Sequence, residues 1–221
     1  MEDNLEQRLQ RLDCCAVSDA LDSLSLTGFV AGLYQLSTTK KIAGRVVTVE
    51  LVSVAENDSA AGGKVQHLGT EAIESAHPGD VIVVKQAEGS TAGCWGGILS
   101  LGASVAGVAG VIAHGFVRDI DEAKNYQFPV YALGTTARTA RGRVRELRTN
   151  HEIQFAGVAV QPADFVIADG SGVAFIKASD AERVITAAER IAAKEALMAK
   201  AVLALMPITK VMGKDYEHLL K

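Results

Sequence analysis

The sequence predicts a layered α/β fold with a partly parallel sheet, arranged as a single domain with a C-terminal helical tail. Continuous apolar runs at 81–84 and 111–113 are typical of strands that are buried on both faces. An Ala- and Gly-rich stretch with helical spacing lies between them, and such alternation favours an α/β fold. No Pro- or Ser-rich linker divides the 221 residues, so we expect one domain over 1–206 and a tail over 207–221.

The N-terminal quarter of the chain predicts two helices and one long strand. Leu5, Leu9 and Leu12 fall on one face of a short amphipathic helix. Ser18 is expected to begin a second, capped helix. β-Branched residues are frequent over 42–54, which predicts a strand.

The rest of the chain predicts further strands, a glycine-rich loop and a long helix. Ser179 and Glu182 fit a capping box that would begin this helix, and Pro207 would stop it after Met206. The other expected elements are a helix at 70–76, a strand at 81–84, the loop at 88–97, a packed helix at 98–109, and strands at 111–113, 128–132, 155–160, 165–168 and 173–176.

Composition and charge exclude several classes of protein. A net charge of −4 argues against nucleic-acid binding, which requires a basic surface. The longest apolar stretch, 93–116, is interrupted by Ser100, Ser104 and His114, so we expect no membrane-spanning helix, and the N-terminus lacks the apolar region of a signal peptide. Three cysteines form no disulfide framework, which favours a cytoplasmic location.

The segment most informative about chemistry is Gly93–Asp119, which predicts a glycine-rich loop, a helix and a strand in succession. Free N–H groups in the first turn of a helix bind anions, so the amides of Gly96, Gly97, Ile98 and Leu99 suit a carboxylate or a phosphate. The alternative is that the glycines only permit close packing of the strand on the helix.

Arg118 and Asp119 come directly after the predicted strand. Ligands of α/β sheets bind outside the carboxyl ends of strands. Asp119 offers oxygen ligands suited to Mg²⁺ or Mn²⁺, and Arg118 offers a fork of donors for a carboxylate or an enolate oxygen. The alternative is a surface ion pair without function.

Two weaker candidates also occur. Cys94 lies near a predicted helix N-terminus, where a thiolate is favoured, but no Cys–His pairing supports a nucleophile, so we expect a small packed side chain. A cluster of arginines could bind an anion, although a solvated face or a subunit contact fits the acidic net charge better. Its members are Arg138, Arg141, Arg143, Arg145 and Arg148.

Six segments, in this order, resemble the RraA-like family over about residues 16–178. This family contains class II 4-hydroxy-4-methyl-2-oxoglutarate/4-carboxy-4-hydroxy-2-oxoadipate aldolases, oxaloacetate decarboxylases and regulators of ribonuclease E activity. The segments are ALDSL, IAGRVVTVE, HPGDVIVV, WGGILSLGASVAGVAGVIAHGFVRD, FPVYALGTT and GVAVQPADFVIADGSGVAFI.

The resemblance implies an αββα sandwich similar to the swivelling phosphohistidine domain, assembled as a homotrimer or a hexamer with sites between subunits. It implies that Asp119 binds a divalent metal, Mg²⁺ or Mn²⁺, and that Arg118 contacts a 2-oxo acid. The backbone of 96–99 would hold the carboxylate of the substrate. Glu195 of a neighbouring subunit would approach the metal; the alternative for Glu195 is a solvated position on a helix.

Two positions depart from the family pattern. Gly97 stands 21 residues before Arg118, where the family's lyases carry Asp or Glu. His114 replaces an acidic residue of the motif that ends in Arg118–Asp119. Histidine titrates near neutral pH, so His114 is a candidate catalytic acid or base, or else a packed core residue.

These observations predict a metal-dependent carbon–carbon lyase, either an aldolase or a decarboxylase. Its substrate would be a small 2-oxo or 3-oxo carboxylic acid, cleaved through an enolate. The alternatives are a non-catalytic regulator that binds a protein, as the ribonuclease E inhibitors do, and a diverged metal-assisted hydratase or isomerase.

Overall fold

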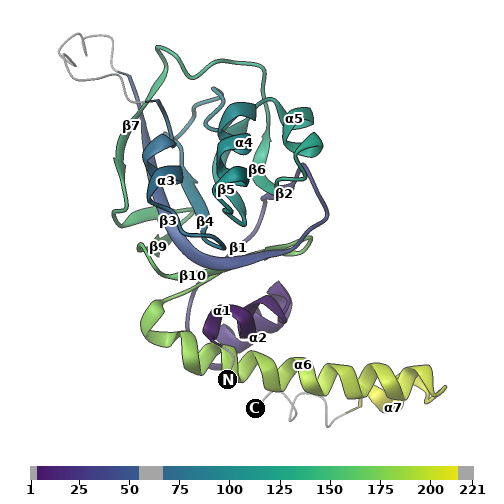
Figure 1. The fold of residues 1–221 in the computed structure, drawn as a ribbon. Coiled ribbons are helices and arrows are strands. Elements are labelled where there is room, and N and C mark those ends of the chain that lie inside the picture. The colour runs from purple at the N-terminus through teal and green to yellow at the C-terminus, as the bar shows by residue number, and fades with distance from the viewer. Residues whose placement is uncertain (1–3, 55–66, 214–221) are drawn as a thin grey trace.

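The computed structural model describes residues 4–54 and 67–213, in which strands and helices alternate through the centre of the chain (Figure 1). The strands are β1 Phe29–Val30, β2 Tyr34–Gln35, β3 Ile42–Ser53, β4 Val81–Lys85, β5 Gly110–Val117, β6 Val130–Thr135, β7 Val144–Thr149, β8 Ile153–Phe155, β9 Val158–Val160, β10 Phe165–Asp169 and β11 Gly172–Ile176. The helices are α1 Leu5–Gln10, α2 Cys14–Ser23, α3 Thr70–Ser75, α4 Gly97–Val105, α5 Ile120–Asn125, the 3₁₀ turn η1 Ala178–Asp180, α6 Ala181–Leu203 and α7 Ile208–Val211.

The long strand β3 connects the two halves of the main sheet. Its first four residues pair antiparallel with β10, and the following residues pair parallel with β4, starting at Val46 opposite Val81. β4, β5 and β6 continue the parallel part, while β7 runs antiparallel beside the end of β3. The strand order is β1-β11-β10-β3-β4-β5-β6-β2, with β7 added at β3. The predicted partly parallel sheet is therefore confirmed.

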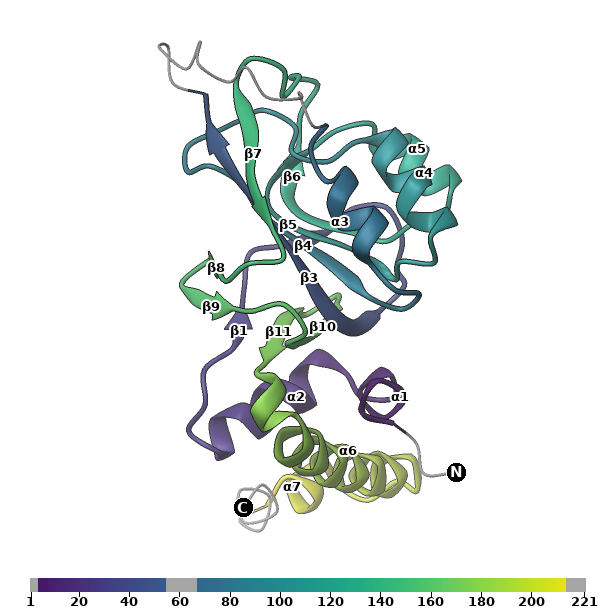
Figure 2. The same cartoon turned by 60° about the vertical axis from the view of Figure 1, so that its left-hand side comes forward.

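Three hydrophobic clusters lie between the layers of the molecule (Figures 1 and 2). The two parts of the sheet that β3 joins form the two inner layers, and helices form the two outer layers. Helices α3, α4 and α5 cover one face of the parallel strands, where Leu99 packs with Val111. The other face packs Ile112 against Phe155 and its neighbours from β8 to β11. Helices α1, α2 and α6 cover the far side of β10 and β11 around Ile185. This arrangement leaves the ends of the parallel strands open for a site.

Two of the predicted helix starts are wrong. α2 begins at Cys14 rather than Ser18, because the Asp13 side chain accepts a hydrogen bond of 2.8 Å from Ala16 N and caps the helix. The chain enters α6 through the turn η1, and the side chain of the N-cap residue Asp180 makes no capping bond. The predicted capping box at Ser179 therefore does not form.

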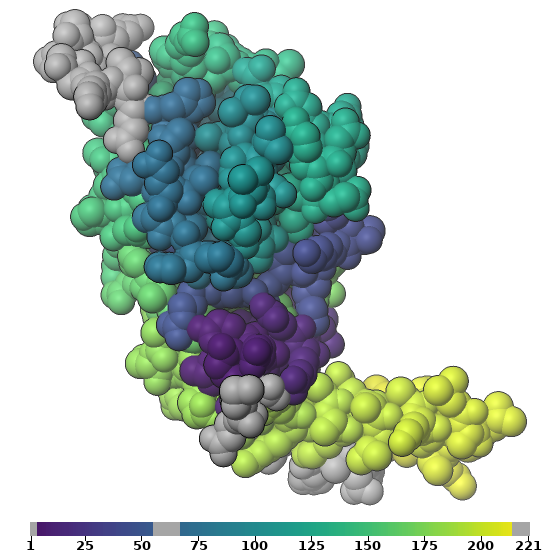
Figure 3. Space-filling view, in the orientation of Figure 1, coloured from purple at the N-terminus to yellow at the C-terminus, as the bar shows by residue number. Residues whose placement is uncertain are grey.

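The long helix α6 extends away from the layered body of the molecule (Figures 1 and 3). Its buried positions end at Ile191, although the helix continues to Leu203. It stops three residues before the expected Met206, and the turn at Pro207 leads into α7. Of the predicted tail, 214–221 lie outside the described residues.

Candidate functional site

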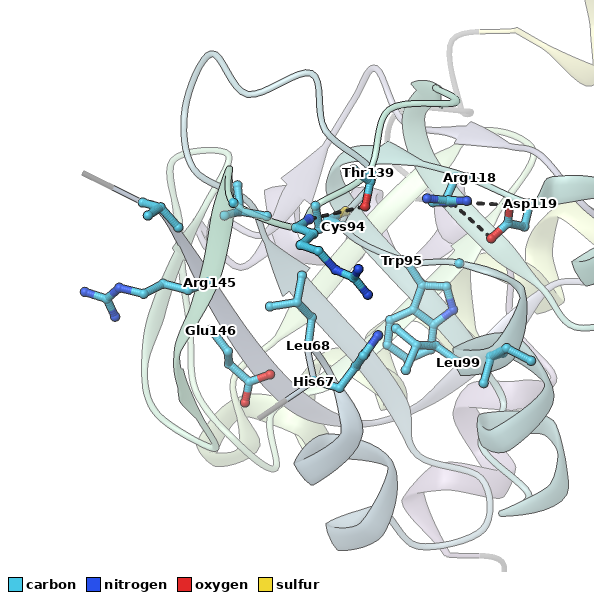
Figure 4. Close-up of a pocket in the computed structure, with 18 of the residues that line it drawn as sticks. His67, Leu68, Cys94, Trp95, Leu99, Arg118, Asp119, Thr139, Arg145 and Glu146 are labelled. Atoms are coloured by element: carbon cyan, nitrogen blue, oxygen red, sulfur yellow. Dashed lines mark hydrogen bonds and ion pairs between the residues drawn. The ribbon is translucent and has the colours of Figure 1, made fainter. Parts of the chain in front are cut away.

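A cavity of about 730 Å³ lies beside the carboxyl ends of β3 and β5 (Figure 4). The loop before α4 and the first residues of that helix form one wall, and β7 with the loop before it forms the opposite wall. Arg118 and Asp119, which follow β5, lie in the wall formed by the loop. The predicted site residues at 96–99, 118 and 119 are thus brought together, in the place that α/β sheets commonly use for ligands.

The glycines of the loop allow Arg118 and Asp119 to lie directly against it. A Cβ on Gly93 would come within 3.0 Å of Cγ and Cδ of Arg118, and a Cβ on Gly96 would come within 3.0 Å of Asp119 Oδ2. Backbone bonds hold the loop beside the end of β5, since Cys94 N donates to Phe116 O and Arg118 N donates to Trp95 O. Larger residues at the two glycines would displace the charged pair.

The first turn of α4 points free N–H groups toward the cavity. Gly97 N donates to Asp119 Oδ2 over 3.2 Å. In the described chain, the N–H groups of Ile98 and Leu99 have no hydrogen-bond acceptor, and the Ile98 side chain is 77% exposed. An anion could therefore bind these two amides, while the Gly97 amide is already used by the protein's own carboxylate.

The Arg118–Asp119 pair is open to solvent. Arg118 Nε lies 3.1 Å from Asp119 Oδ2, and the two side chains are 38% and 35% exposed. Such an exposed pair contributes little to stability. Asp119 adopts the left-handed conformation, with φ of 55°, which is uncommon for residues other than glycine. No described residue accepts a bond from the Nη atoms of Arg118, which leaves these donors available to a ligand.

The donor set suits a hydrated Mg²⁺ or Mn²⁺. Mg²⁺ commonly binds one or two carboxylates and keeps several waters, and Asp119 offers a carboxylate at the cavity wall. Over 4–54 and 67–213, no three His, Cys, Asp or Glu side chains are grouped so that they could enclose an ion. A cation at Asp119 would therefore retain positions for water and for substrate oxygens.

Three arginines of the predicted cluster lie in the opposite wall of the cavity. Arg141 and Arg145 line it from the loop before β7 and from β7 itself, and Arg148 lines it farther along the strand. The sequence patterns predict no strand between 132 and 155, so β7 is an addition from the structure, and these arginines were expected on a solvated face or at a subunit contact. Their positive charges suit a substrate that carries a carboxylate.

Arg148 also belongs to an ion-pair network around the buried carboxylate of Glu50. Its Nε lies 2.7 Å from Oε2 of Glu50, and Lys85 Nζ lies 2.6 Å from Oε1. Burial is the largest single effect and would raise the pKa of Glu50, but the hydrogen bonds and charges of Lys85 and Arg148 together outweigh it and hold this pKa below its ordinary value. The network fixes the position of β7 beside β3 and β4.

Two predicted site residues lie outside the cavity in this chain. The His114 ring packs on Phe155, with the ring centroids 5.5 Å apart, in the layer between the two sheets. Glu195 lies on α6, where burial and the nearby charges of Asp13 and Asp19 raise its pKa. Neither residue faces Asp119 of its own chain, so the proposed acid–base role of His114 and a contribution of Glu195 to a neighbouring subunit stay predictions.

Cys94 is a packed residue at the base of the loop. The side chain is 2% exposed, and burial raises the pKa of its thiol to about 12. It is therefore protonated at neutral pH. This agrees with the preferred reading of Cys94 as a small core residue.

Together, these features define an α/β protein with a glycine-loop and Arg–Asp site at the edge of a parallel sheet. The chain belongs to the RraA-like family. The model of this family, described as Aldolase/RraA, matches residues 14–175. The resemblance that the sequence motifs predicted is confirmed.

Individual relatives differ in how much of their length corresponds to this chain. A protein of Halalkalibacterium halodurans, provisionally named 4-hydroxy-4-methyl-2-oxoglutarate aldolase, is 31% identical over 191 residues, which cover 84% of this chain and 82% of that protein. Protein DlpA of Legionella pneumophila is 26% identical over 182 residues. That alignment covers 82% of this chain but 29% of DlpA, so most of DlpA has no counterpart here.

Solved structures share the fold over most of the chain. Streptomyces coelicolor RraAS2, described as an unusual member of the RNase ES inhibitor RraA protein family, has a TM-score of 0.76 at 25% identity and covers 89% of this chain and 96% of its own. An uncharacterised protein of Pseudomonas syringae has a TM-score of 0.82 at 23% identity, covering 95% and 96%, and supports the fold alone. In the described part of the chain, no helix has the length and apolar character needed to cross a membrane.

Proposed function

We propose that this chain is a divalent-metal-dependent carbon–carbon lyase, an aldolase or decarboxylase acting on a small 2-oxo or 3-oxo carboxylic acid. One observation supports this proposal above all: the Arg118–Asp119 pair and the open amides of α4 line the same cavity. Arg118 supplies a positively charged donor there, Asp119 supplies a carboxylate for a metal ion, and the amides supply a site for an anion.

The reaction would place the substrate between these groups. Its carboxylate accepts hydrogen bonds from the amides of Ile98 and Leu99, and its 2-oxo oxygen faces the free Nη donors of Arg118. In a decarboxylation the departing fragment is CO₂; in a retro-aldol cleavage it is a carbonyl compound, whose former hydroxyl proton passes to water. Either cleavage leaves an enolate, whose negative charge Arg118 stabilises through charge-assisted hydrogen bonds. A bound Mg²⁺ or Mn²⁺, held by Asp119, would supply Lewis-acid stabilisation of the same charge. Residues of the opposite wall, including Arg141, hold the remainder of the substrate.

The test is a screen of 2-oxo and 3-oxo acids with Mg²⁺ or Mn²⁺, with and without EDTA, in which release of pyruvate or CO₂ is measured. We expect metal-dependent turnover that is lost in Arg118→Ala. Arg143→Ala is a matched control, because Arg143 lies outside the cavity wall. Full activity of Arg118→Ala would refute the site.

A second candidate function is a protein-binding regulator of the ribonuclease-inhibitor type. The description of S. coelicolor RraAS2 suggests it, and an exposed apolar stripe of Ile98, Leu101 and Val105 on α4 offers a surface for a protein partner. Inactivity toward every acid, together with inhibition of a purified ribonuclease E-type enzyme, would favour this function. A metal-assisted hydratase or isomerase would instead convert a substrate without release of pyruvate or CO₂.

We also propose that the chain assembles with itself, as a homotrimer or hexamer. The protruding end of α6 and the turn after it support this, because Leu197, Leu203 and Leu205 are 66%, 82% and 90% exposed in one chain. Light scattering should report three or six chains, and Leu203→Glu should reduce that number. A fold of the swivelling phosphohistidine type, a small carboxylic-acid ligand and a cytoplasmic location belong to the same proposal.

A further inference from the structure

A second carboxylate lies beside Asp119 at the start of α4. Asp119 is the N-cap residue of α5 and Glu122 lies in its first turn, where Glu122 N donates a hydrogen bond to Asp119 O. A Cβ on Gly97 would come within 1.9 Å of Glu122 Oε2 and within 3.2 Å of Asp119 Cβ. Because both distances start from the same point, Glu122 Oε2 lies no more than about 5.1 Å from Asp119 Cβ.

The charges at this point are unbalanced. Arg118 pairs with Asp119, whereas the Glu122 carboxylate makes no hydrogen bond or ion pair within the described residues. Two carboxylates this close repel each other. The N-terminus of α4 offsets only about half a unit charge. A cation placed between the carboxylates would balance the remaining charge.

We infer that Glu122 is the second acidic group of the metal site at Asp119, and that Gly97 is the residue that leaves room for it. This inference rests on the proposed function, because the proposed function places the metal at Asp119. Glu122 binds the ion directly or through one of its waters, as acidic groups beside a metal commonly do. The carboxylate that the sequence lacks at position 97 is thus supplied from α5.

The inference is tested by Mn²⁺ binding to the full chain, measured without substrate by calorimetry and by the electron paramagnetic resonance of free Mn²⁺. Glu122→Gln should weaken Mn²⁺ binding by about tenfold, within the range found for groups that support metal ligands. Asp121→Asn is a matched control on the same helix, since Asp121 is exposed and pairs with Lys124; it should change the affinity less than twofold. An unchanged affinity in Glu122→Gln would overturn the inference.

A rescue experiment separates this role from simple stabilisation of the helix. Alone, Gly97→Asp forces the Glu122 carboxylate to move and should not strengthen Mn²⁺ binding, because its Cβ overlaps that carboxylate. In the Glu122→Ala background, the same Gly97→Asp change should recover most of the lost affinity. Equal effects in the two backgrounds would contradict the inference, since coupled residues give non-additive changes. Thermal unfolding of each variant shows whether it is folded.

The Mn²⁺-binding and turnover measurements together distinguish the proposed lyase function from the proposed role of Glu122 in metal binding. Weaker Mn²⁺ binding in Glu122→Gln, with no acid cleaved by the unmodified chain, would support the metal site and reject the lyase. Metal-dependent turnover with unchanged Mn²⁺ affinity in Glu122→Gln would support the lyase and reject the role of Glu122. If the unmodified chain binds no Mn²⁺ at millimolar concentration, the inference is wrong.

Discussion

Replacement of Asp119 by glycine should remove activity while leaving the fold nearly as stable as before. The carboxylate accepts hydrogen bonds from Gly97 N and from Arg118 Nε. The exposed pair with Arg118 contributes little, so the main loss is the bond from Gly97 N, which costs about 0.5–1.5 kcal/mol. The left-handed backbone at φ of 55° costs an ordinary residue about 1–2 kcal/mol, which glycine avoids. The greater freedom of glycine in the unfolded chain costs about 0.4–1 kcal/mol. These effects nearly cancel.

Asp119→Ala is the informative comparison, because it loses the same hydrogen bond and keeps the unfavourable backbone. We expect it to unfold about 2–4 °C below Asp119→Gly, the shift that corresponds to about 1 kcal/mol in a chain of this size. Both variants should show no metal-dependent turnover of the substrate found in the screen. The reasoning would be refuted if Asp119→Gly kept full turnover, or if it unfolded well below Asp119→Ala in calorimetry.

Three further predictions concern the surroundings of the site. Gly93→Ala should displace Arg118 and lower kcat/KM by about 10²-fold, as expected for a misplaced catalytic group, whereas Gly170→Ala, which has open space around its Cβ, should not change it. Glu50→Gln should lower the free energy of unfolding by about 1–3 kcal/mol at pH 7, measured with urea. Because the folded state lowers the pKa of Glu50, this contribution is complete above its unfolded pKa of about 4.3 and is lost as the pH falls through the folded value, so the two proteins should converge in acid. Iodoacetamide at pH 8 should modify the exposed Cys15 rapidly and leave Cys94 unmodified, as mass spectrometry can show; equal rates would contradict the burial of Cys94.

The centre of the site could be predicted from the sequence because its signals are local. The apolar runs around 93–119 define strand, loop and helix by themselves, and the glycines mark where the backbone approaches the charged pair. Arg118 and Asp119 come directly after β5, so the end of the strand placed them at the sheet edge. The sequence therefore indicated the residues that the structure brings together in one wall of the cavity.

The opposite wall could not be predicted because tertiary contacts form it. β7 contains four polar or charged residues out of six, without an apolar residue at every second position, and it is held by pairing with β3 and by the bond between Arg148 and Glu50. α5 has only six residues, too few for a periodic signal. The position of Glu122 against Gly97 depends on this short helix, so the sequence showed the missing acid but not its replacement.

The chain contains a single tryptophan, and its position has a practical consequence. Trp95 is 2% exposed at the turn into α4, and its indole N–H donates to Ser100 Oγ over 3.0 Å. Its carbonyl oxygen accepts the backbone N–H of Arg118. The tryptophan fluorescence of the protein therefore originates from one indole ring in the cavity wall, and titration of the unlabelled protein with Mn²⁺ or an oxo acid can be followed by the intensity and wavelength of this emission.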